Sequence, residues 1–389
     1  MKKIIALILA LCMALSLSSA ALAEDSRGTI MWLSNLSSGI QFETTRDYLK
    51  ALCDKMGYQF TIVYGDGYND AAGNLTAVSN GMTSDVVGII VSQDGGLASI
   101  MEQYPDVYVA GYNTDMTSVY GEGGANAAVL TKEHFLGTIC DGFQDGANMG
   151  HQYFNAIVEK GYKRIAVINF PGYAYPNQIS AVNAFTADLE TYNAAAADDA
   201  KITLVGEPLT LEFQPLADSF FLEDGMDNLD CIVAFCAGLQ FVYPTMQTAK
   251  VNGFCRADTQ MITGGFDNNA DIIADIGSAA DGKSIGWICI SPAEDPAYAL
   301  VLLDNAISGS QFADFAVERV DSASYIIDST EKINAAMTKG MVGSGDITLA
   351  QVSVDEVLQL CTRFNPDATF AGLKALFASE KVMSDALLK

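Results

Sequence analysis

The chain contains very little histidine and few basic residues. Its 389 residues include only two histidines, His134 and His151, and 21 Lys and Arg against 47 Asp and Glu. The formal net charge of −26 argues against nucleic acid or an anionic membrane as a partner, because both bind basic surfaces. Two histidines offer almost nothing for a zinc site or a histidine-based catalytic triad. We therefore expect no metal and no cofactor.

Paired cysteine patterns are also missing, and no Cys-x-x-Cys occurs. Seven cysteines follow Cys12, and an odd number cannot all form disulfides. Several lie inside apolar runs such as DCIVAFC and GWICI, which is typical of buried thiols that pack as small hydrophobic groups. We therefore expect free cysteines at positions 53, 140, 231, 236, 255, 289 and 361.

One long apolar run is present, at the start of the chain. Two lysines precede it and Ala-Leu-Ala ends it at Ala23, which predicts a secretory signal peptide over residues 1–23. Leu11 stands where a lipidation motif requires a small residue, so we expect no lipid on Cys12. No later run is long enough to cross a bilayer, and the mature chain is predicted to be an exported, soluble protein that starts near Glu24.

Apolar runs alternate with amphipathic helical patterns through most of the remaining sequence. The runs are nearly continuous, as in strands of parallel sheets that are buried on both faces. Strand–helix–strand order predicts right-handed crossovers and open α/β sheets. The Gly-rich segment 117–137 is interpreted as an extended loop. The predicted strands are residues 29–34, 59–64, 86–92, 107–112, 164–169, 202–205, 231–235, 261–266 and 284–290, and two further strands lie in FAVERV and SYIID.

The two halves of this pattern are similar to each other. YLKALCDKMGYQFTIVYG and YFNAIVEKGYKRIAVIN each contain a helix, a Gly-Tyr pair, a polar residue and a strand. Gly57 and Gly161 fit the left-handed position that ends many helices. The similarity predicts two related α/β lobes.

Three motifs resemble those of the type I periplasmic binding proteins, the group of ribose-binding protein and the lac-repressor ligand domain. They are NAIVEKGYKRIAVIN, ITGGFDNNADII and SPAEDPAYALVLLDNAISG, and the resemblance extends over residues 29–328 in the same order. It implies two Rossmann-like lobes with parallel sheets, three crossovers that form a hinge, and a ligand in the cleft. Lobe one is then residues 28–130 and 293–322, lobe two is 135–292, and 323–345 is a crossover and linker.

Residues 346–389 extend beyond the resemblance and are predicted to form a helical tail. Asn365 and Pro366 separate two helical patterns there. The tail should dock on a lobe surface, because its apolar residues need burial. These residues are Val354, Val357, Leu358, Phe364, Leu373, Leu376 and Phe377.

Candidate ligand contacts follow from the rule that open α/β sheets bind ligands beyond the carboxyl ends of their strands. Together with the resemblance, this rule selects Ser38, Phe42, Asp94, Asn113, Asn177, Gln178, Asp267 and Glu294. Each has a structural alternative: Ser38 and Asp267 can cap helices, Phe42 can belong to the core, and Asp94 and Asn113 favour turns. The three carboxylates would make the cleft acidic and favour a neutral or cationic ligand.

The predicted function is capture of a small polar ligand, a sugar or polyol, for delivery to an ABC importer by a monomeric, non-enzymatic binding protein. A ligand-sensing partner of a membrane receptor remains an alternative, as does a secreted hydrolase. Neither GEGGAN at 121–126 nor GSG at 343–345 forms a nucleotide loop or nucleophile elbow. A repressor is disfavoured because a signal peptide occupies the place of a DNA-binding headpiece.

Overall fold

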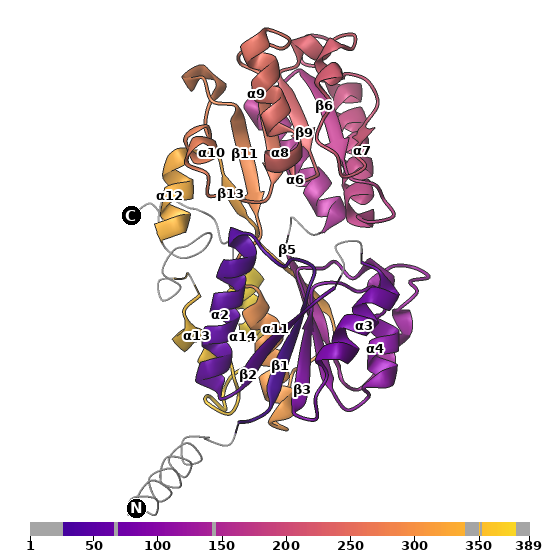
Figure 1. Ribbon diagram of the computed structural model, residues 1–389, viewed down its shortest axis with the longest axis vertical. Coiled ribbons are helices and arrows are strands. Elements are labelled where there is room, and N and C mark those ends of the chain that lie inside the picture. Colours follow the sequence, from indigo (N-terminus) through magenta and orange to yellow (C-terminus); the bar gives the residue numbers. More distant parts are fainter. Residues whose placement is uncertain (1–25, 66–68, 142–144, 339–349, 351, 379–389) are drawn as a thin grey trace, which may run out of the picture.

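The two predicted lobes are present and lie end to end (Figure 1). The computed structural model describes residues 26–65, 69–141, 145–338, 350 and 352–378. The predicted signal peptide lies outside these residues. None of the helices in these ranges is long and apolar enough to cross a membrane.

The first lobe contains a six-stranded sheet in which all pairs of neighbours are parallel. The strand order is β12-β5-β4-β3-β1-β2. Its strands are β1 (Thr29–Ser34), β2 (Gln59–Tyr64), β3 (Val86–Val91), β4 (Tyr108–Tyr112), β5 (Phe135–Asp141) and β12 (Arg319–Ser322).

The second lobe contains a seven-stranded sheet with the order β13-β11-β10-β9-β6-β7, and β8 also pairs with β6. All pairs are parallel except β11 with β13, which are antiparallel. Its strands are β6 (Arg164–Asn169), β7 (Thr203–Leu204), β8 (Leu209–Thr210), β9 (Cys231–Ala234), β10 (Gln260–Gly264), β11 (Ile285–Ile290) and β13 (Tyr325–Ile327).

Burial on both faces explains why the strands were recognisable as continuous apolar runs. Every residue of β1, β9, β10 and β11 is buried. Each lobe has two hydrophobic clusters, and together they contain the inward side chains of its strands and flanking helices. The predicted strands agree with the observed ones to within two residues, except that FAVERV begins four residues before β12. All seven cysteines predicted to be free are buried and unpaired.

Helices cover both faces of the two sheets (Figure 1). In the first lobe they are α2 (Ile40–Met56), α3 (Ala71–Gly81), α4 (Leu97–Gln103), α5 (Thr117–Tyr120), η1 (Ala127–Thr131), α11 (Pro296–Ile307), α13 (Val354–Leu358) and α14 (Phe370–Ala378). In the second lobe they are α6 (Gly146–Lys160), α7 (Pro176–Ala195), η2 (Asp218–Leu222), η3 (Met226–Asn228), α8 (Gly238–Phe241), α9 (Tyr243–Asn252), α10 (Ala270–Ala274), η4 (Ala279–Asp281) and α12 (Thr330–Thr338).

Two predicted boundaries are wrong. Residues 135–141 form β5 and pair with β4 and β12 in the first sheet, so they belong to neither the loop nor lobe two. The strand was missed because Gly137 and Thr138 interrupt its apolar character, although all seven of its residues are buried. The expected linker at 323–345 contains β13 and α12, whose Ile333 and Ala336 are buried in the second lobe.

The chain crosses between the lobes after β5, after β11 and between β12 and β13, which are the three crossovers of the predicted hinge. It crosses once more after α12. Ile333 of α12 is buried in the second lobe, whereas Ala350 packs into a cluster of the first. The described part of the tail therefore packs on lobe one.

The tail covers α11, which explains an unusual feature of that helix. All residues from Pro296 to Ala306 are buried, so α11 has no solvent face and needs cover opposite the sheet. The rings of Phe370 and Phe377 lie 6.4 and 6.0 Å from Tyr298 of α11. The expected docking of two tail helices is confirmed in the described part, although Phe364 is 42% exposed.

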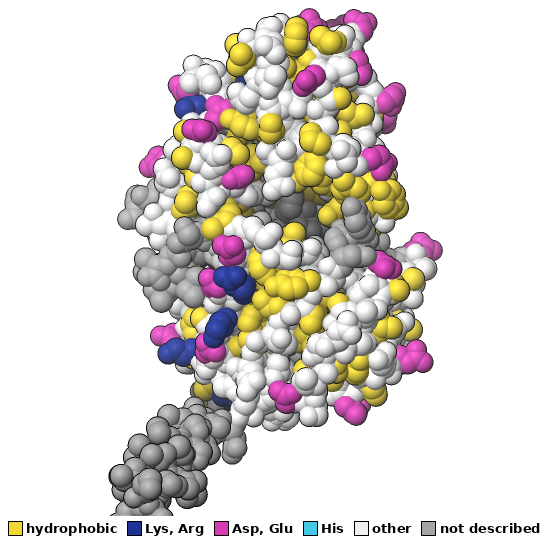
Figure 2. All heavy atoms as spheres, viewed as in Figure 1, with side chains coloured by type: hydrophobic (Ala, Val, Ile, Leu, Met, Phe, Trp, Pro, Cys, Tyr) yellow, Lys and Arg dark blue, Asp and Glu magenta, His cyan; other side chains and the backbone are white. Residues whose placement is uncertain are grey.

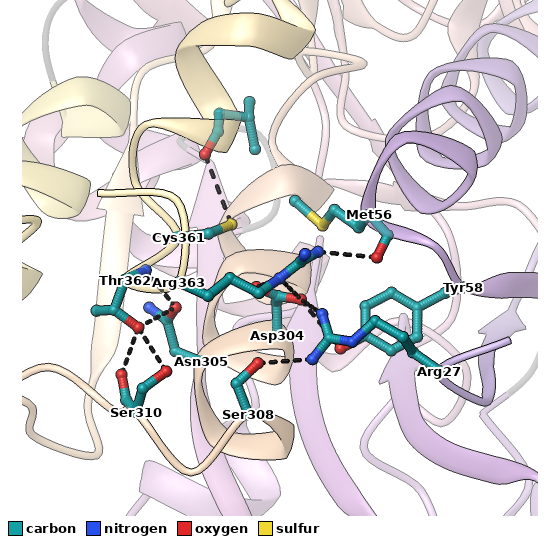
Figure 3. A network of polar contacts seen from close by, with 11 residues as sticks. Arg27, Met56, Tyr58, Asp304, Asn305, Ser308, Ser310, Cys361, Thr362 and Arg363 are labelled. Carbon is teal, nitrogen blue, oxygen red and sulfur yellow. Dashed lines mark hydrogen bonds and ion pairs between the residues drawn. The ribbon is translucent and has the colours of Figure 1, made fainter. Parts of the chain in front are cut away.

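A buried carboxylate joins the tail, α11 and the start of the chain (Figure 3). The side chain of Asp304 is fully buried and accepts hydrogen bonds from Arg27 at 2.7 Å and Arg363 at 2.9 Å. The Tyr58 hydroxyl donates to the same carboxylate at 3.0 Å. Arg363 also donates to the Met56 carbonyl at 2.8 Å. One buried carboxylate therefore holds two arginines that are far apart in the sequence.

Replacing Asp304 with alanine should destabilise the protein, because two arginines would lose their shared anion in a buried site. Removal of one member of a buried ion pair typically costs about 3–5 kcal/mol of unfolding free energy. Urea denaturation measures the change. The matched control is Asp54→Ala, which breaks the exposed Lys50–Asp54 pair and should leave the midpoint almost unchanged. Equal midpoints for the two variants would contradict a central role for Asp304.

Candidate ligand-binding cleft

The cleft between the lobes contains a cavity of about 290 Å³. Figure 2 shows this face of the molecule hollowed between the lobes, with hydrophobic side chains on both sides of the hollow. The first lobe contributes the ends of β1, β3 and β4 and the start of α2, and the second contributes the segments after β6, β9 and β10. The cavity thus lies where the strands of both sheets end.

Aromatic rings form the wall of the cavity on the first lobe. Trp32 of β1 stacks on Phe42 of α2 with ring centroids 5.4 Å apart and an interplanar angle of 21°. Tyr112, at the end of β4, lies 6.4 Å from Trp32. The indole N–H of Trp32 donates to the Ser92 hydroxyl at 2.8 Å, which fixes the orientation of the ring. The three rings are a rigid apolar surface.

A second aromatic cluster faces the cavity from the other lobe. The ring of Phe170, directly after β6, lies 5.5 Å from Tyr175 and 5.1 Å from Phe241. Gln178 of α7 accepts a hydrogen bond from the Phe170 backbone N–H at 2.7 Å, which holds this turn in place. A ligand in the cavity therefore meets aromatic side chains on both sides.

The polar groups of this cavity are hydroxyls and amides. Among the described residues that line it there is no Asp, Glu, Lys, Arg or His. The Asn113 carboxamide oxygen is buried and has no hydrogen-bond partner, and its backbone is left-handed with φ 57°. Gln41 donates to the Ser291 carbonyl at 3.1 Å. The expectation of an acidic cleft is wrong for this cavity.

Five of the eight predicted contacts line the uncharged cavity: Ser38, Phe42, Asn113, Asn177 and Gln178. Asp94 lines a second cavity, which adjoins the first. Its carboxylate accepts hydrogen bonds from the Asn69 side chain and the Ser118 backbone N–H, both at 2.9 Å. Asp94 therefore stabilises the loops of lobe one, which agrees with the alternative that this residue has a role in a turn.

The other two predicted contacts, Asp267 and Glu294, line neither cavity. Asp267 accepts a hydrogen bond from the Asn269 backbone N–H at 2.8 Å, just before α10. Glu294 is only 1% exposed and lies in the crossover after β11, where the Tyr325 hydroxyl donates to it at 2.6 Å. Glu294 therefore links the crossover after β11 to the start of β13.

The aromatic residues Trp32, Tyr112, Phe170 and Tyr175 were not predicted as ligand contacts, although they line the cavity. Their signal in the sequence is weak, because a ring at the end of an apolar strand is also typical of the core. Their position at the carboxyl ends of β1, β4 and β6 was the available clue.

The cavity also contains a cysteine, Cys236, in the turn after β9. Burial raises the pKa of its thiol to about 12, so the thiol is protonated at neutral pH. A thiolate is the reactive form of cysteine. Among the described residues, no group of three or more His, Cys, Asp or Glu side chains is arranged to hold a metal ion.

Known structures share this architecture, although no protein-family model and no curated protein matches the chain. An ABC transporter solute-binding protein from Burkholderia graminis, in complex with D-arabinose, is 15% identical with a TM-score of 0.58, over 80% of this chain and 98% of that one. A glucose–galactose binding protein from Geobacillus stearothermophilus is 12% identical with a TM-score of 0.56, over 77% and 97%.

A third structure, a periplasmic binding protein/LacI transcriptional regulator from Alkaliphilus metalliredigens complexed with D-xylulofuranose, is 17% identical. Its TM-score is 0.51, over 77% of this chain and 97% of the other. The chain therefore has the type I periplasmic binding protein fold, as the sequence motifs suggested. At these identities the comparison establishes the fold.

Because the Cys236 thiol is protonated at neutral pH, we expect that it does not act as a nucleophile in the cleft. Because the raised pKa keeps the thiolate fraction very small, iodoacetamide at neutral pH should leave Cys236 of the folded protein unlabelled. Intact-mass and peptide mass spectrometry measure the labelling. The same protein unfolded in urea is the control and should label at all its cysteines. Rapid, selective labelling at Cys236 in the folded protein would contradict this assignment.

Proposed function

We propose that the protein is an exported, non-enzymatic solute-binding protein that captures a neutral or cationic sugar or polyol between its lobes and presents it, as a monomer, to an ABC importer. The observation that carries the proposal is the uncharged cavity between the lobes, with aromatic rings on both sides and amides among them. The predicted signal peptide over residues 1–23 supports export.

The chemistry of the cavity matches that of a sugar. A pyranose or furanose ring has apolar C–H faces, which pack on aromatic rings such as Trp32, Phe42 and Phe170. Its hydroxyls need directional hydrogen bonds, and Asn113, Asn177 and neighbouring side chains provide donors and acceptors. Pockets of this composition, mostly apolar with a few placed polar groups, are typical small-molecule sites.

The absence of charge from the described lining narrows the ligand class. Phosphates and carboxylates are usually bound by Arg, by Lys or by helix N-termini with charged partners, and no basic side chain is among the described residues that line this cavity. An anionic sugar would lose its hydration without gaining a cation. The proposal therefore excludes sugar phosphates and uronates as main ligands.

The connection between the lobes provides the conformational response. Three short crossovers meet at the cleft, and small changes in their backbone angles would let the lobes close over a ligand. The buried residues Glu294, in the crossover after β11, and Tyr325, at the start of β13, are hydrogen-bonded to each other. Closure would bring the two aromatic clusters onto opposite faces of one sugar ring.

A thermal-shift screen of the mature chain tests the proposal. Neutral pentoses, hexoses and polyols should include a compound that raises stability by roughly 2.7 kcal/mol at about one hundred times its dissociation constant. Small-angle scattering should then show a smaller radius of gyration. The matched sugar phosphates and uronates are controls and should have no effect. Stabilisation by the anionic compounds alone would contradict the proposal.

We also propose that Asp267 contacts the ligand in the closed form. Its neighbours Gly265 and Phe266 line the cavity, and its bond to the Asn269 N–H occupies one oxygen, Oδ1. The second oxygen would accept a charge-assisted hydrogen bond from a sugar hydroxyl.

Asp267→Ala should therefore weaken binding by roughly tenfold or more, and lower the unfolding free energy by about 1 kcal/mol through the lost hydrogen bond to the Asn269 N–H. Calorimetric titration and thermal melts measure the two effects. Asp271→Ala, an exposed acidic residue in the first turn of α10, is the control and should retain affinity. A mutant that melts early but binds normally would show that Asp267 serves only the turn before α10.

A further inference from the structure

A second cavity adjoins the uncharged one and has a different chemical character. It has a volume of about 420 Å³ and lies between the loops after β3 and β4, α5 and the start of α7. The two cavities share Asn35, Ser92, Asn113, Tyr175 and Asn177. A ligand bound in the first cavity can therefore extend a substituent or a second ring into the second cavity.

The second cavity is acidic. Asp94, Asp115 and Glu122 line it, and no Lys, Arg or His is among its described lining residues. Asp94 is only 6% exposed, and the groups that donate to its carboxylate, the Asn69 amide and the Ser118 backbone N–H, are neutral. Burial raises the pKa of Asp115, and the Asp94 charge acts in the same direction. The local charge is thus not balanced by a basic side chain of the lining.

A buried amide in the same cavity has no partner. Gln93 is 5% exposed and lines the cavity, and neither its carboxamide oxygen nor its nitrogen makes a hydrogen bond. Buried polar groups are nearly always paired, because an unsatisfied one loses the hydrogen bonds it makes to water. Gln93 is therefore suited to a polar group that enters the cavity from outside the chain.

We propose that the ligand carries an amine, and that this protonated amine lies in the second cavity beside Asp94, Asp115 and Gln93 while a neutral ring occupies the first. The chemical class is an amino sugar or a short amine-bearing glycoside. This assignment rests on the proposed function and narrows it. Carboxylates attract the ammonium group, the Gln93 carboxamide oxygen accepts from it, and the aromatic cavity binds the uncharged ring.

Calorimetric titration with matched sugar pairs tests the assignment. D-Glucosamine and D-galactosamine, and the amine-bearing disaccharide of glucosamine, are compared with D-glucose, D-galactose and cellobiose at about pH 6, where amines are protonated. The best amine-bearing compound should bind at least roughly tenfold more tightly than its neutral parent, as expected for one charge-assisted hydrogen bond. Equal affinities within each pair would overturn the assignment and leave the proposed function intact.

Variants separate the second cavity from the first. Asp115→Asn keeps the acceptor for the Thr117 backbone N–H but removes the charge, so it should abolish the preference for the amine and leave the neutral parent's affinity unchanged. Glu102→Gln, an exposed residue of α4 outside both cavities, is the charge control and should retain the preference. A preference that survives both Asp115→Asn and Asp94→Asn would overturn the assignment.

Gln93→Leu distinguishes a ligand contact from a structural residue. Because its amide has no partner in the chain, the substitution should not lower the melting temperature of the ligand-free protein, yet it should weaken binding of the amine. A lower melting temperature with unchanged affinity would contradict the role of Gln93. If no neutral or amine-bearing sugar binds the wild-type chain, the proposed function itself fails, and the assignment fails with it.

Discussion

Parallel strands end together, and both sheets of this protein end at the cleft between the lobes. Each strand of a parallel sheet delivers its last residue to the same edge, so side chains that are far apart in sequence meet there. The cavity lining shows this arrangement directly, with Ser34, Ser92 and Asn113 from the first lobe and Phe170, Cys236, Gly264 and Ser291 from the second.

The same geometry explains what could be predicted from the sequence. Strands buried on both faces produce apolar runs, so most of both sheets and the two-lobe order were predictable, whereas β5 escaped because Gly137 and Thr138 interrupt its pattern. Polar residues after strands identified Asn113 and Asn177 for the cavity. The rule predicts the sheet edge at which a residue lies, but not where its side chain points. It therefore also selected Glu294, which lines neither cavity and accepts a hydrogen bond from Tyr325. Cavity rings such as Trp32 look like core residues in a sequence.

The acidic side chains of this protein lie outside the first cavity. The chain is strongly acidic, and Figure 2 shows acidic side chains over its outer surface, yet the described lining of the first cavity is uncharged. The second cavity is lined by Asp94, Asp115 and Glu122, and other carboxylates, such as Asp304 and Glu294, are buried away from both cavities. Asp304 of α11 binds Arg363 of the tail and Arg27, which precedes β1.

Tryptophan fluorescence tests the central claim, that a neutral ring binds against the aromatic wall of lobe one. The chain has two tryptophans: Trp32 lines the cavity, whereas Trp287 is buried beside Tyr153 in the second lobe, with ring centroids 4.8 Å apart. In a Trp287→Phe variant, Trp32 is the single reporter. Titration with a ligand that calorimetry shows to bind should change its emission saturably, with the same dissociation constant. Tight binding that leaves the Trp32 emission unchanged would place the ligand elsewhere and contradict the account.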